Sequence, residues 1–163
     1  MKPEIWYDWD NNKNQSVFEN NFYNLHAPDI KEDTTMDANM KKRNELLAKT
    51  VIKGLESRNM SGYYAQDKEA ALKQALELIP NGSTIAMGGC MSAHEIGLVK
   101  ALQDGEYNYI DRAKLEPREG LMAAYDADFF LSSANAVTDD GVLVNIDGNS
   151  NRVSCIAQGP KKV

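Results

Sequence analysis

The chain alternates between two patterns of apolar positions, one typical of helices and the other of buried strands. From about 40 to 59, apolar residues recur three or four positions apart with Lys and Glu between them, which predicts an amphipathic helix. The same pattern continues to Ile79 after Asp67, a residue type that often caps helix N-termini. A third predicted helix begins at Ser92, and a short one covers 117–125.

Short apolar runs between these helices predict strands, and turn residues bound them. The predicted strands are 62–65, 83–87, 107–110, 128–134, 142–144 and 153–157. Strands that alternate with helices predict an α/β fold with an open, mostly parallel sheet and helices on both faces. The two late turns, 138–141 and 145–151, predict a hairpin or excursion inserted into that sheet.

The two ends of the chain differ from this pattern. Residues 1–36 are rich in Asn, Asp and Glu and hold no period, so we expect a poorly structured N-terminal extension. Its aromatic residues, such as Trp6 and Trp9, leave a docking role open. One α/β domain is expected over 37–163. Because 159–163 resembles the start of a strand, we expect this domain to lack its final strand and helix.

The composition argues against several classes of function. A net charge of −6 without a long Lys/Arg run is unsuited to nucleic-acid binding, which requires neutralisation of phosphates. No stretch approaches the roughly 18 apolar residues of a membrane span, and the first residues lack the apolar core of a signal peptide. With only two cysteines, Cys90 and Cys155, a disulfide framework is not expected and a cytoplasmic location is.

The turn Gly88-Gly89 is the first candidate for a ligand site. It ends an apolar strand just before a predicted helix, where unpaired backbone N–H groups and the helix dipole attract anions. In open α/β sheets, ligands bind beyond the carboxyl ends of the strands. A structural explanation is also available, because Ser92 and Glu95 match a capping box. The motif is neither G-x-G-x-x-G nor a Walker loop, so it implies no nucleotide cofactor.

A second polar constellation spans 135–152, reading NAVTDDGVLVNIDGNSNR. Its amides and carboxylates suit a polar cleft, although Asp-Gly steps are also ordinary turn chemistry. Arg152 could bind a carboxylate or phosphate through two N–H groups, or it could simply be solvated. We hypothesise that this segment and the glycine turn form two walls of one cleft. The candidate ligand-binding residues are Gly88, Gly89, Ser92, Glu95, Asn135, Asn145, Asp147, Asn149 and Arg152.

The few Cys and His residues do not have the spacing of a metal site, so neither a metal nor another cofactor is expected. Cys90 lies beside a predicted helix N-terminus, where a thiol pKa can be lowered. No partnered base for it is evident in the sequence. Catalytic residues therefore stay unassigned.

The segments GGCMSAHEIGL, YNYIDR, ADFFLSSANAVTDDGVLVNIDGNSNRV and GPKKV resemble the LUD domain, found in LutC-type lactate-utilization proteins and in small stand-alone relatives. The resemblance runs from about Met40 to Val163. It implies a fold similar to that of ribose-phosphate isomerases and CoA transferases, in which a glycine turn at a helix start binds a substrate anion. Gly88, Gly89 and Ser92 match that turn, whereas Cys90 stands where Ser is usual and removes a hydroxyl donor.

Three functions follow as hypotheses. The resemblance implies a protein of lactate or organic-acid utilization that binds a small anionic metabolite and works with an iron–sulfur oxidoreductase subunit, since this chain has too few cysteines for a cluster. A homo-oligomer is a further candidate assembly. The second hypothesis is a non-catalytic interaction or assembly subunit, in which Asn135, Asn145 and Arg152 would point away from the glycine turn. The third, by fold analogy alone, is a CoA- or sugar-phosphate-type enzyme.

Overall fold

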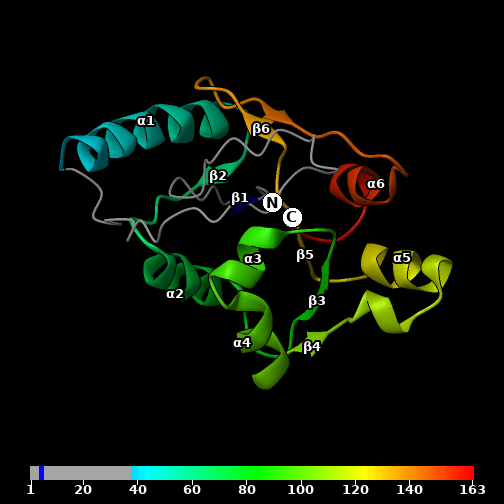
Figure 1. Cartoon of the computed structure of the whole chain (residues 1–163). Coiled ribbons are helices and arrows are strands. Elements are labelled where there is room, and N and C mark those ends of the chain that lie inside the picture. Colours follow the sequence, from blue (N-terminus) through cyan, green and yellow to red (C-terminus); the bar gives the residue numbers. More distant parts are fainter. Residues whose placement is uncertain (1–3, 6–37) are drawn as a thin grey trace, which may run out of the picture.

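The computed structural model describes residues 4–5 and 38–163, and a parallel three-stranded sheet lies at its centre (Figure 1). β3 (Thr84–Met87) is the middle strand, between β4 (Asn108–Tyr109) and β5 (Phe129–Leu131). Both neighbours pair with β3 in parallel. Beyond β5, Lys162 forms an isolated parallel bridge with Phe129, outside the strands of the sheet.

Helices cover both faces of this sheet. Successive strand residues point to opposite faces, and in β3 Ile85 belongs to one core and Ala86 to the other. The first core packs against α2 (Lys68–Leu78), α3 (Met91–Glu95) and α4 (Leu98–Asp104). The second packs against α5 (Pro117–Tyr125) and α6 (Asn151–Gln158). Figure 1 shows α2 and α4 on one side of β3 and α5 on the other. The predicted open α/β fold is therefore confirmed.

The remaining elements lie outside the central sheet. α1 (Ala38–Ser57) precedes β2 (Ser61–Gly62), which pairs in parallel with β1 (Glu4–Ile5). β6 (Ala136–Val137) and β7 (Leu143–Val144) form an antiparallel pair, and a 3-10 turn spans Arg112–Lys114. The predicted hairpin exists, but as a separate two-stranded sheet. Apart from β1, the expectation for residues 1–36 lies outside the described residues.

Two predicted elements are wrong. Residues 153–157 are not a strand but part of α6, whose first turn is held by the Asp147 carboxylate. A short apolar run does not separate strand from helix by period alone, and this helix depends on a capping residue several positions upstream. The third predicted helix is broken, because Gly97 adopts a left-handed conformation (φ 78°) between α3 and α4. Among the described residues, no helix is long and apolar enough to cross a membrane.

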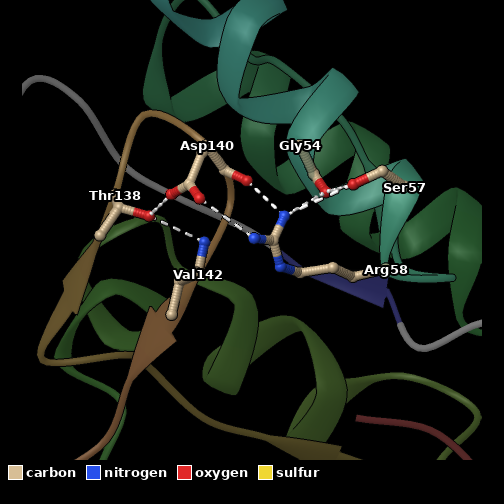
Figure 2. A network of polar contacts seen from close by, with 6 residues as sticks. All are labelled: Gly54, Ser57, Arg58, Thr138, Asp140 and Val142. Carbon is tan, nitrogen blue, oxygen red and sulfur yellow. Dashed lines mark hydrogen bonds and ion pairs between the residues drawn. The ribbon is translucent and has the colours of Figure 1, made fainter.

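The β6–β7 turn docks directly on α1, and two glycines allow the approach. A Cβ built on Gly54 would lie 2.2 Å from the Asp140 carbonyl oxygen, and one on Gly141 would lie 2.4 Å from the Gly54 carbonyl carbon. Around this contact, Arg58 donates to the Gly54 carbonyl at 3.1 Å and pairs with the Asp140 carboxylate at 3.1 Å (Figure 2). Backbone thus packs on backbone, with an exposed ion pair alongside.

Because of this contact, we expect Gly54→Ala to destabilise the protein, which is the opposite of the usual effect inside a helix. Gly→Ala inside a helix ordinarily stabilises by about 0.5–1 kcal/mol, but Gly54→Ala should lower the free energy of unfolding by roughly 2 kcal/mol, because the methyl group overlaps the hairpin backbone. Urea denaturation measures the effect. Gly148→Ala, where a Cβ meets nothing within 4 Å, is the matched control and should change little. Stabilisation by Gly54→Ala would contradict this docking.

Candidate functional site

The two glycines of the predicted turn have different structural roles. Gly88 is buried, and a Cβ there would lie 2.4 Å from the Phe130 ring and 3.3 Å from Cγ of Arg152. Gly89 is exposed and has a φ of 55°, which side-chain-bearing residues rarely adopt. The turn therefore needs one glycine for close packing and the other for its conformation. The Gly88 contact also shows that the stem of Arg152 lies against this turn.

The predicted capping box is not formed. α3 begins at Met91 after Cys90, which makes no side-chain capping bond, so Ser92 lies inside the first turn. Glu95 is the last residue of this five-residue helix, and it pairs with Lys68 of α2 at 3.7 Å. A helix this short contributes a small dipole, so the argument for an anion at its N-terminus loses its force.

Arg152 connects the segments of the second predicted constellation. Its guanidinium donates to the side-chain oxygens of Asn145 at 2.9 Å and Asn135 at 2.8 Å. It also donates to the backbone carbonyls of Ser133 and Ile146. Every one of these acceptors is a neutral oxygen. Arg152 therefore ties the end of β5 and both sides of the β6–β7 hairpin to the start of α6.

Asp147 occupies the N-terminus of α6. One carboxylate oxygen accepts from the backbone N–H groups of Arg152 at 2.7 Å and Val153 at 3.0 Å, and the other accepts from Asn149 at 3.2 Å. These bonds, that from Val153 above all, hold the pKa of Asp147 below its ordinary value of 3.8. The protein's own carboxylate thus takes the position that a bound anion would have at this helix. Asn149 enters the arrangement through its backbone.

A cavity of about 350 Å³ lies along β5 and the residues that follow it, and this volume suits a small-molecule ligand. Helix α2, helix α3 and β7 contribute to its walls, together with Ile156 and the last two residues. The walls are mostly apolar. The polar groups among them are Tyr64, Asp67, Lys68, Cys90, Ser92, Ser132, Ser133, Asn145 and Lys162.

The structure brings together only part of the predicted site. Ser92 and Asn145 line the cavity, whereas the other candidate residues are not among its lining. Arg152 instead hydrogen-bonds two of the lining residues, Ser133 and Asn145. The sequence reasoning missed Lys68, Ser133 and Lys162. Ser133 lies near the end of the predicted strand 128–134, whereas no local pattern marks the two lysines.

Cys90 lines the cavity and is buried. Burial raises the pKa of its thiol, and this outweighs the opposing effects of Ala93, Ser133 and Arg152. The thiol is therefore protonated at neutral pH, which argues against an activated nucleophile. Among the described residues, no group of three or more Cys, His, Asp and Glu side chains could hold a metal ion.

Fold and site together define an α/β protein with a ligand-sized cavity at the edge of a parallel sheet. Residues 48–163 match the LUD domain, so the chain belongs to the LUD domain family, which is related to lactate utilization. No curated protein and no solved structure matches the chain significantly.

If Arg152 holds the cavity wall, then its geometry should matter as well as its charge. Arg152→Met should lower the free energy of unfolding by roughly 2–4 kcal/mol, because the partly buried oxygens of Ser133 and Asn145 lose their donor. Arg152→Lys keeps the charge but cannot serve these acceptors from one plane, so it should restore only part of the loss. Urea denaturation measures both. Arg118→Lys, on the exposed face of α5, is the control, and equal stability of Arg152→Lys and the wild type would contradict this role.

The Asp147 cap predicts part of the response to acid. A carboxylate whose pKa is lowered by folding stabilises the protein above its unfolded pKa, and this stabilisation is lost as pH falls through the folded pKa. The free energy of unfolding should therefore fall with decreasing pH below about 4. Asp147→Ala should start less stable and show a shallower fall. Asp139→Ala, at an exposed turn, serves as control, and an unchanged slope for Asp147→Ala would refute the cap.

Proposed function

We propose that this LUD-domain protein binds a small anionic metabolite of lactate or organic-acid utilization in the cavity along β5. The observation that carries the proposal is the position of two lysines, Lys68 and Lys162, in the lining of a cavity of ligand size. The cavity also includes residues just beyond the carboxyl ends of β3 and β5, the usual place for ligands in open α/β sheets. Family membership supports the metabolic context.

The proposal assigns direct contacts to different residues from those of the glycine turn. Ser92, Ser133 and Asn145 line the cavity and carry hydrogen-bonding groups suited to a carboxylate or its hydroxyl substituent. Arg152 supports Ser133 and Asn145 through its own hydrogen bonds and so acts as a positioning residue. A stand-alone LutC-type protein of this kind would work in the cytoplasm beside an iron–sulfur oxidoreductase subunit, as the family resemblance implies.

One observation favours the assembly-subunit alternative. Val142, Val144 and Ile146 alternate along the hairpin and are all exposed, Ile146 at 73%. Such a stripe suits a protein contact. The stem of Arg152 lies beside Gly88, with its Cγ 3.3 Å from a Cβ built there, so the second constellation adjoins the glycine turn.

Calorimetric titration of the full chain with lactate, pyruvate, sugar phosphates and CoA esters tests the proposal. A carboxylate ligand should bind saturably at one site per chain. Lys162→Met and Lys68→Met should each weaken it roughly tenfold or more, the usual scale for a charge-assisted hydrogen bond. Lys73→Met, on the same helix as Lys68 but outside the cavity, should leave affinity unchanged. Binding of none of these anions, or equal loss in Lys73→Met, would refute it.

A further inference from the structure

The walls of the β5 cavity are more apolar than a three-carbon acid requires. Residues from three elements give it large hydrocarbon surfaces, among them Leu78, Ile79, Ile96, Phe129, Phe130 and Leu143. A sugar phosphate would leave its hydroxyl groups without partners against such walls, and burying an unpaired hydroxyl is costly. A hydrocarbon chain would gain free energy from the same surface. The lining therefore favours a ligand with an apolar body.

The charged residues of the lining indicate the polar group of the ligand. Lys68 and Lys162 are its cations, and Asp67 is its acid. The Asp67 carboxylate already accepts from the backbone N–H of Ala70 at 2.8 Å, as the cap of α2. The site therefore favours an anion over a neutral or cationic molecule.

At Lys162, the positive charge and the apolar wall of the cavity lie side by side. Its ammonium lies 5.2 Å from the centre of the Phe129 ring, and both residues line the cavity. Lys68 lies 3.7 Å from the Glu95 carboxylate and is half exposed. A cation against an aromatic wall matches a ligand in which a carboxylate continues directly into hydrocarbon.

We infer that the cavity takes an amphipathic monocarboxylate with a medium-length hydrocarbon body, its carboxylate at Lys162 and its chain along Phe129 and the apolar wall. This inference rests on the proposed function, since it concerns the same cavity. It goes further by naming a ligand class larger and more apolar than lactate. The expected gain is about fourfold in affinity per buried methylene, until the cavity is full.

Calorimetric titration of the full chain with a matched series tests this inference. The series is lactate, butanoate, hexanoate and octanoate, with octan-1-ol and octylamine as uncharged and cationic counterparts of octanoate. Affinity should rise along the acids, and octanoate should bind at least tenfold more tightly than either counterpart. Lys162→Met should remove most of the preference for octanoate over octanol while leaving octanol binding unchanged. Lys73→Met is the matched control.

Cys90 reports whether the acid binds in this cavity. Alkylation at alkaline pH, with each site followed by mass spectrometry, should slow at Cys90 when octanoate is bound, because Cys90 is in the lining. Cys155 is fully buried and outside the lining, so it reports global stabilisation instead. Protection of Cys90 well beyond that of Cys155 supports the assignment, and equal protection overturns it.

The outcomes separate the two proposals. Binding of lactate or pyruvate with no gain from longer chains overturns the amphipathic ligand and leaves the proposed function standing. Equal binding of octanol and octanoate overturns the amphipathic monocarboxylate, because the site would then have no preference for its charge, and the proposed function is then decided by the titrations with lactate and pyruvate. Rising affinity along the acids, together with loss of charge selectivity in Lys162→Met, supports both.

Discussion

The guanidinium of Arg152 holds together three pieces of chain that secondary structure alone leaves separate. Its acceptors lie just after β5, just before β6 and just after β7. The Ser133 and Asn145 oxygens are partly buried, and such groups are costly to leave unpaired, whereas the Asn135 and Ile146 oxygens are exposed. Arginine suits the position because its planar group presents several N–H donors in fixed directions. The wall containing Ser133 and Asn145 therefore depends on one residue from a neighbouring helix.

The same region shows why polar residues near a glycine turn need not bind a ligand. Asp147 and Arg152 look like a charged pair available to a substrate, yet the carboxylate caps α6 and the guanidinium is occupied by backbone and amide oxygens. Both charged groups are engaged in hydrogen bonds that hold the loop in place. The cavity beside them is mostly apolar, and its polar lining includes hydroxyls, an amide and two lysines from separate parts of the chain. Structural and ligand-binding roles are thus divided between adjacent layers of residues.

The sequence patterns predicted those elements that depend on residues close together in the chain. The apolar run at 83–87 became the central strand, and Asp67 caps α2 as expected. Of the predicted ligand-binding residues, Ser92 and Asn145 line the cavity. The failures concern long-range contacts. α6 depends on a carboxylate upstream of it, and Lys162 reaches the cavity only because its segment pairs with β5. Neither of these long-range contacts produces a periodic pattern in the sequence.

The claim that the β5 cavity is the ligand site can be tested most directly by amide NMR of the full, isotope-labelled chain titrated with a carboxylate. We predict saturable shifts at Cys90, Ser133, Asn145 and Lys162, with Asn108 and Lys114 at the opposite edge of the sheet unchanged. Shifts confined to α1 or β4, or no saturable shifts with any carboxylate, would contradict it.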